Sequence, residues 1–98
     1  MKENLLQIVN HYGLKHQLKY IHTEYYELDE TILNYITGNE DREHIAEELS
    51  DCFVMLKQFQ YYYGIEDKDI EKIMKYKIDR QLKRIEKENK WKGYLKYF

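Results

Sequence analysis

The chain has 98 residues, of which 35% are charged, with a net charge of −2, no proline and a single cysteine. This near balance of charge gives no general attraction for nucleic acid or an anionic membrane surface, and one cysteine excludes a disulfide framework and a cysteine-rich zinc site. With no signal-peptide pattern and no apolar run of about 18 residues, the protein is expected to be cytoplasmic and to have no membrane segment.

The first predicted elements are a short helix and a long one. A helix from Lys2 to about Tyr12 ends at Gly13, a natural helix terminator. From Leu14 to Thr37, apolar side chains recur in alternating steps of four and three, which predicts a long amphipathic helix. Its apolar stripe consists of Leu14, Leu18, Ile21, Tyr25, Leu28, Ile32 and Tyr35.

A second long helix is predicted from Asp41, a suitable capping residue, to Tyr63, and it closes at Gly64. Its stripe consists of Ile45, Leu49, Cys52, Leu56, Phe59 and Tyr63. A connection of about four residues makes two such helices antiparallel neighbours, so they are expected to form a hairpin. Cys52 is expected to be a core residue.

In the last predicted helix, the segment "IEDKD" supplies an acidic first turn, and the apolar stripe is lost in "EKENK". Its apolar residues are Ile70, Ile73, Met74, Ile78, Leu82 and Ile85. The tail "WKGYLKYF" carries Trp91, Tyr94, Leu95, Tyr97 and Phe98, and these are expected to dock, over an intersubunit seam or over one end of a functional site. We therefore expect a single all-α domain over residues 1–98, an antiparallel helical bundle completed by oligomerisation because so short a chain buries little surface.

Two segments, "HTEYYELDE" and "EELSDCFVML", carry acids three residues apart. At about 100° per residue, Glu24 and Glu27 lie to one side of the first stripe, with Glu24 at the edge of the seam. Glu48 and Asp51 lie on the same side of the second stripe, so the antiparallel register pairs Glu24 with Asp51 and Glu27 with Glu48. Such a cluster costs stability unless cations occupy it, and carboxylates favour Mg²⁺ or Mn²⁺. A solvated acidic edge is the alternative.

Other polar residues complement this cluster. In "KYKIDRQLKR", Lys77, Arg80 and Arg84 share one flank of the last helix and could neutralise a polyphosphate. Gln17 and Tyr20 lie on the acid-bearing flank, where an amide could hydrogen-bond to a bound ligand and a ring could stack on it. The alternative for the cations is pairing with neighbouring acids, namely Asp79, Glu86 and Glu88. The histidines, His11, His16, His22 and His44, form no helical pair with metal-ligand spacing, and each is expected at the surface.

At these residues the chain resembles the MazG-like all-α nucleoside triphosphate pyrophosphohydrolases, in which an ExxE motif precedes ExxD. "TEYYEL" and "EELSDCFVML" carry the resemblance, and "YGLKHQ" and "KIDRQLKR" extend it. It implies that Glu24, Glu27, Glu48 and Asp51 hold Mg²⁺ and take part in catalysis. It implies that Lys77 and Arg80, with Arg84, meet a nucleoside triphosphate, which is converted to monophosphate and pyrophosphate, and Gln17 and Tyr20 could then contact its base. Because one short chain buries little apolar surface, a homodimer or a dimer of dimers is expected, in which a neighbouring subunit helps to enclose the nucleotide.

Two other classes compete with this reading. A di-iron bundle usually needs Glu-x-x-His pairs, and neither Glu24 nor Glu48 has a histidine three residues on. A non-enzymatic helical interaction or regulatory protein of phage or mobile-element origin, whose acids remain from an enzymatic ancestor, stays open. A measurement of metal binding distinguishes such an interaction protein from a metal-dependent enzyme.

Overall fold

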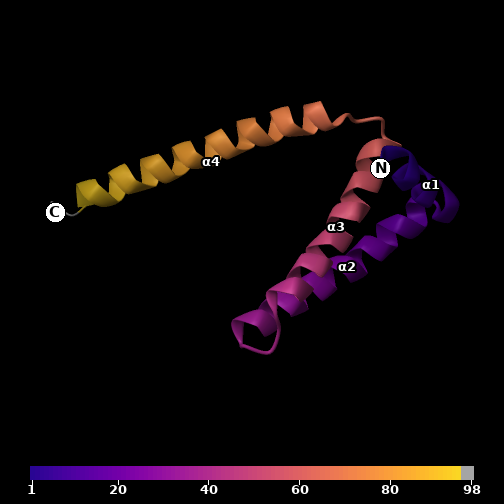
Figure 1. The fold of residues 1–98 in the computed structure, drawn as a ribbon. Helices are drawn as coiled ribbons and strands as arrows, with labels where there is room; N and C mark the ends of the chain where they lie inside the picture. Colours follow the sequence, from indigo (N-terminus) through magenta and orange to yellow (C-terminus); the bar gives the residue numbers. More distant parts are fainter. Residues whose placement is uncertain (96–98) are drawn as a thin grey trace. The chain divides into compact units, whose positions relative to one another are not determined.

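Four α-helices make up the described part of the chain. The computed structural model describes residues 1–95, with side chains described for residues 1–93. The helices are α1 (Lys2–Tyr12), α2 (Leu14–Ile36), α3 (Arg42–Tyr62) and α4 (Asp67–Leu95), as Figure 1 shows. No strand occurs in residues 1–95, so the predicted all-α class is confirmed.

The predicted helix boundaries agree with the structure to within a few residues in the first two thirds of the chain. Gly13, which separates α1 from α2, has a φ of 89°, a conformation that residues with a side chain rarely adopt. The Asp41 carboxylate accepts a hydrogen bond of 2.9 Å from the backbone N–H of His44, which confirms the predicted cap of α3. These local signals place the turns on either side of α2.

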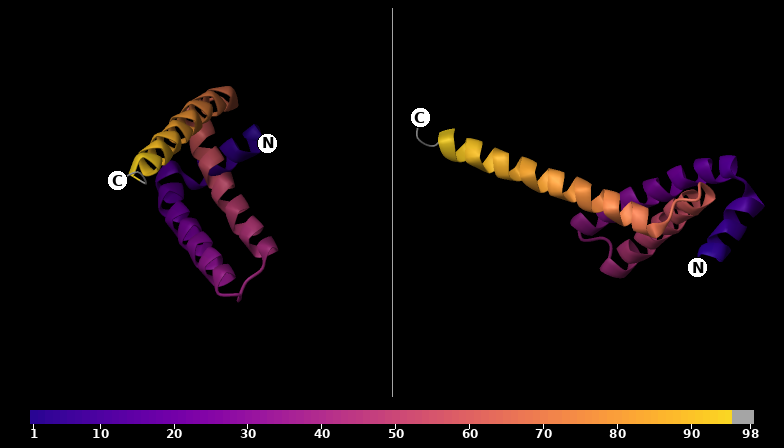
Figure 2. Two further views of the ribbon diagram at one scale, coloured as in Figure 1. Left: turned by 90° about the vertical axis from the view of Figure 1, so that its left-hand side faces the viewer. Right: turned by 90° about the horizontal axis from the view of Figure 1, so that it is seen from above.

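The contacts divide the chain into two units, the first covering Met1–Gly64 and the second beginning at Ile65. In the first unit, α2 and α3 lie side by side and run in opposite directions, and α1 packs against both (Figures 1 and 2). The first unit therefore contains the predicted hairpin and the acidic residues on both of its long helices.

The seam between α2 and α3 differs from the predicted apolar stripe. On α2 the buried line is Gln17, Ile21, Glu24 and Thr31, whereas Leu18, Tyr25 and Ile32 stay partly exposed. On α3 the buried residues are Cys52, Met55, Gln58, Gln60 and Tyr61. Both helices are turned toward the acid-bearing flank, because an amphipathic face is wide enough to hold two adjacent lines of side chains and periodicity cannot choose between them.

This rotation corrects the predicted place of Glu24. Its side chain lies in the seam with 6% of its surface exposed, rather than at the edge. The expected burial of Cys52 is confirmed, and burial raises the pKa of its thiol, with the charges of Glu24, Asp51, Glu48 and Asp29 adding to the effect.

Large apolar side chains remain exposed on the first unit. Ile36 on α2 and Phe53 on α3 are 73% and 60% exposed, whereas Tyr61 on α3 is buried. Among residues 1–95, none of the helices has the length and apolarity that crossing a bilayer requires. The first unit thus offers apolar surface that its own helices leave uncovered.

The second unit is built on α4, which is longer than predicted. It begins at Asp67 and continues through "EKENK" to Leu95, because Glu and Lys favour helices and pairs such as Lys90 and Glu86, 3.6 Å apart, support them. Trp91 is 61% exposed. The expected docking of the aromatic tail stays a prediction, since the side chains of Tyr94 and Leu95 and all of residues 96–98 lie outside the described residues.

Candidate functional site

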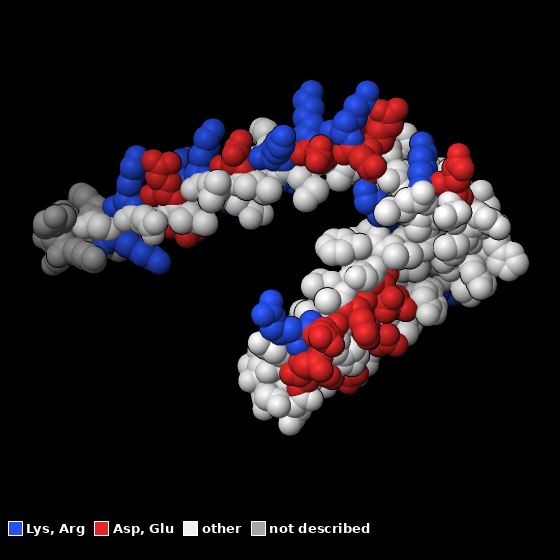
Figure 3. Space-filling model, in the orientation of Figure 1, with Lys and Arg blue, Asp and Glu red and all other residues white. Residues whose placement is uncertain are grey.

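Three of the four predicted acids come together in the hairpin. Glu24 and Glu27 on α2 and Glu48 on α3 each offer a carboxylate oxygen, and these oxygens lie within 4.8 Å of one another. Glu24 is buried, Glu48 is half-buried and Glu27 is exposed. Figure 3 shows acidic side chains gathered on this face of the hairpin. The arrangement is therefore a partly desolvated group of carboxylates that reaches the surface at one side.

Two carboxylate oxygens in this group lack a partner. Oε2 of Glu24 and Oε2 of Glu48 are both buried and accept no hydrogen bond. A buried oxygen without a donor costs free energy, about 1–3 kcal/mol and more when it is charged. A divalent cation would satisfy both atoms, and a site of oxygen donors without thiolate suits Mg²⁺ or Mn²⁺. The residues present fit such an ion.

Asp51, the fourth predicted acid, is exposed on α3 and lies outside the three-oxygen group. It lines the same cavity as Glu24, and its charge is one of those that act on Tyr20. Asp51 is therefore placed at the boundary between the acids and the cavity.

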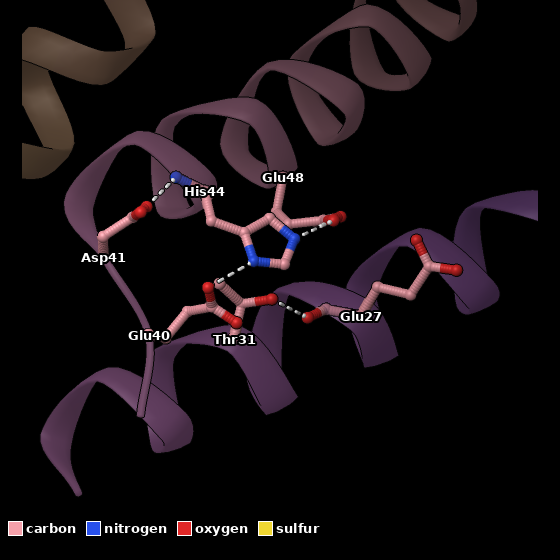
Figure 4. A network of polar contacts seen from close by, with 6 residues as sticks. All are labelled: Glu27, Thr31, Glu40, Asp41, His44 and Glu48. Atoms are coloured by element: carbon pink, nitrogen blue, oxygen red, sulfur yellow. Dashed lines mark hydrogen bonds and ion pairs between the residues drawn. The ribbon is translucent and has the colours of Figure 1, made fainter. Parts of the chain in front are cut away.

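A histidine that the sequence analysis assigned to the surface bridges two acids beside this group. His44 Nδ1 lies 2.8 Å from Oε1 of Glu40, and Nε2 lies 3.2 Å from Oε1 of Glu48 (Figure 4). Both carboxylates only accept when ionised, so the ring bonds to both as an imidazolium. The hydrogen bond to Glu40, followed by its charge and the contact with Glu48, raises the pKa of His44 against the opposing effect of burial. The spacing of Glu40, His44 and Glu48, four residues each, is the signal that would have found this bridge.

A cavity of about 400 Å³ opens beside the acids in the first unit. It lies among α1, α2 and α3, with Glu24 and Asp51 in its wall. Its lining residues are Ile8, Tyr12, His16, Gln17, Tyr20, Glu24, Asp51, Val54, Met55 and Gln58. Both predicted base-contacting residues, Gln17 and Tyr20, are thus in this wall.

Three stacked rings from α1 and α2 form part of the wall. His16 stacks on Tyr12 with centroids 5.2 Å apart and on Tyr20 with centroids 6.3 Å apart. Tyr20 lies beside Glu24, and hydrogen bonding to Glu24, with the charges of Glu24, Glu27 and Asp51 and with burial, raises the pKa of the phenol. The rings therefore connect the cavity wall directly to the acids.

Two buried amides lie at the cavity. Gln17 Nε2 donates to Oε1 of Gln58 over 2.8 Å, and Gln17 Oε1 is 2.8 Å from His16 Nδ1, which must carry the proton because an amide oxygen only accepts. Gln58 Nε2 donates to the carbonyl of Val54 at 3.3 Å and approaches the sulfur of Met55. Gln17 was predicted to meet a base edge, but its amide nitrogen is already bonded to Gln58. Gln58, which the sequence analysis missed, is 1% exposed.

The predicted cationic residues belong to the second unit. Lys77, Arg80 and Arg84 are exposed on α4, and the Arg80 guanidinium lies 6.0 Å from the centroid of the Tyr76 ring. Their expected contact with a triphosphate stays a prediction.

Comparison of the chain with models of known protein families, with curated proteins and with solved structures finds no match. The site's own geometry must carry any assignment of function.

Proposed function

We propose that this protein is a metal-dependent nucleoside triphosphate pyrophosphohydrolase that converts NTP or dNTP to the monophosphate and pyrophosphate. The observation that carries the proposal is the Glu24 carboxylate, which is buried, has an oxygen without a partner, lies within 4.8 Å of two other acids and also lines a cavity. Burying such a group is costly unless a cation binds it.

The cavity supports a nucleotide substrate. Its volume of about 400 Å³ falls in the range of small-molecule sites, roughly 300–1,000 Å³. The rings of Tyr12, His16 and Tyr20 offer aromatic surface against which a base can stack. A base held there lies beside the acids, as a triphosphate substrate requires, because the phosphates must reach the cation.

The chemistry divides between the acids and the cations. Mg²⁺ or Mn²⁺ held by Glu24, Glu27, Glu48 and Asp51 would neutralise phosphate oxygens and make a water more acidic. The Tyr20 hydroxyl, which lies beside Glu24, is proposed to orient that carboxylate, and one of the four carboxylates is proposed to accept the proton of the attacking water. Lys77, Arg80 and Arg84 are proposed to balance the remaining charge of the triphosphate.

The proposal includes assembly as a homodimer or a dimer of dimers. Apolar side chains such as Ile36 and Phe53 remain exposed on the first unit, and a second copy that covered them would complete the helical bundle. Light scattering over a dilution series tests this: activity and helicity should fall together as the assembly dissociates. A fully active, folded monomer at assay concentrations would contradict it.

The experiment that tests the function is a screen of the common nucleoside triphosphates with Mg²⁺, in which monophosphate, diphosphate, phosphate and pyrophosphate are resolved. The expected products are monophosphate and pyrophosphate in equal amounts. Diphosphate and phosphate as products would contradict the assignment.

A non-enzymatic interaction protein is the second candidate, and the exposed apolar surface favours it. Such a protein would have no use for a cation at Glu24. Failure to bind Mn²⁺, together with no turnover of any triphosphate, would leave this candidate ahead of the hydrolase.

A further inference from the structure

The bridge made by His44 joins the loop before α3 to the acids of the hairpin. Figure 4 shows the ring between Glu40, which precedes the cap of α3, and Glu48, which lies one helical turn after His44. The ring is 39% exposed, so its place is not set by core packing. Two hydrogen bonds to carboxylates hold it.

This bridge distinguishes the two oxygens of Glu48. Oε1 accepts from His44 Nε2 at 3.2 Å, whereas Oε2 is buried and has no partner. A free Glu side chain has several rotamers and would lose their entropy on binding an ion. With Oε1 occupied by His44, Glu48 presents one defined oxygen to the other acids.

Glu40 fixes the ring in turn. Its Oε1 lies 2.8 Å from Nδ1, and its side chain is 23% exposed, so the contact is partly shielded from water. The backbone N–H of the same histidine is tied to Asp41. The ring is thereby held from both sides before any ion binds.

We infer that His44 is a positioning residue that, oriented by Glu40, holds Glu48 so that its Oε2 faces the cation position. This inference rests on the proposed function, because His44 acts through Glu48, which is itself a proposed ligand of the metal. Outer residues of this kind typically change metal affinity by about 10- to 100-fold.

The test compares two variants that lose the same charge. His44→Gln keeps an N–H donor that can reach Glu48, and His44→Met has no donor, while the two side chains have similar length and helix propensity. The free Mn²⁺ signal in electron paramagnetic resonance gives the affinity of each, and circular dichroism checks the helices. His22→Gln, at an exposed site on α2, is the control.

His44→Met should bind Mn²⁺ at least about tenfold more weakly than the unchanged protein, with His44→Gln between the two. Loss of the imidazolium charge alone would tighten Mn²⁺ binding in both variants equally, so equal affinities, or tighter binding in both, would overturn the inference. If His44→Met lost its helicity, Glu40→Gln would replace it, compared with the exposed Glu43→Gln: a larger loss in Glu40→Gln supports the bridge, and equal effects overturn it. Failure of the unchanged protein to bind Mn²⁺ would instead overturn the proposed metal site, and the inference with it.

Discussion

Two sets of polar side chains with buried atoms lie in the same seam, and they differ in whether their hydrogen-bonding groups find partners within the chain. Gln17 and Gln58 are joined by a 2.8 Å hydrogen bond, and their remaining groups meet His16, Val54 and Met55. Glu24 and Glu48 each keep a buried oxygen with no donor. The amide pair is complete within the chain, whereas the carboxylate group is complete only with something added.

The difference shows how to separate polar residues that stabilise a fold from polar residues that bind a ligand. A satisfied pair can be explained by the folded chain alone. An unsatisfied buried carboxylate reduces stability, so its presence indicates a gain elsewhere. Substitutions in the carboxylate group and in the amide pair should therefore have different effects on activity and stability.

The largest expected effect is on turnover. Glu48→Gln should lower kcat/KM by at least about a hundredfold, because a held metal contributes several kcal/mol to the transition state. The neighbouring Glu47→Gln is the matched control, since Glu47 is exposed on the same helix. Steady-state kinetics with Mg²⁺ measure both, and full activity in Glu48→Gln and in Asp51→Asn would refute the assignment.

Metal should also stabilise the fold. At 100 times its dissociation constant, Mn²⁺ should add about 2.7 kcal/mol to the free energy of unfolding. For a chain of this size that raises Tm by on the order of 10 °C. Thermal scans with and without Mn²⁺ measure the shift, and Glu24→Gln should lose it while melting higher than the unchanged protein without metal. A Tm that Mn²⁺ leaves unchanged would count against the site.

Replacing one member of the amide pair should lower the stability of the metal-free protein, whereas Glu24→Gln should raise it. Gln58→Met leaves the Nε2 of Gln17 without its oxygen acceptor, which should cost about 1–3 kcal/mol of stability. The double variant Gln17→Met with Gln58→Met removes both partners and should recover much of that loss, because no buried donor is left over. Urea denaturation of the two single variants and the double variant gives the coupling, and strictly additive losses would show that the pair is not a unit.

The smallest expected effect is a pH dependence at the His44 bridge. Because Glu40 first, and then Glu48, raises the pKa of His44 in the folded protein, the bridge stabilises the metal-free fold fully below the unfolded pKa of about 6.5. That stability is lost as pH rises through the raised folded pKa. The difference in Tm between the unchanged protein and His44→Gln should therefore shrink between acid and alkaline pH, and a constant difference would contradict the linkage.

The sequence by itself determined the helices and which acids could meet. Glycines and an acidic cap set the turns around α2 and at the start of α3, since these signals act over a few residues. The angles of Glu24, Glu27 and Glu48 from the apolar stripes, with an antiparallel register, predicted that these acids meet on one flank, and in the structure one oxygen of each lies within 4.8 Å of the others. Stripe periodicity did not identify where α4 ends, because a charged helix such as "EKENK" needs no apolar face.

Only the tertiary structure decided which line of each helix is buried. Apolar periodicity favoured Leu18 and Tyr25, but the packed seam buries Gln17 and Glu24. The choice depends on how two wide faces and α1 fit together, which is a property of three helices at once and not of one. The same packing aligned His44 with Glu40 and Glu48 and closed a cavity beside Glu24, because those contacts arise from side-chain positions that no single segment specifies.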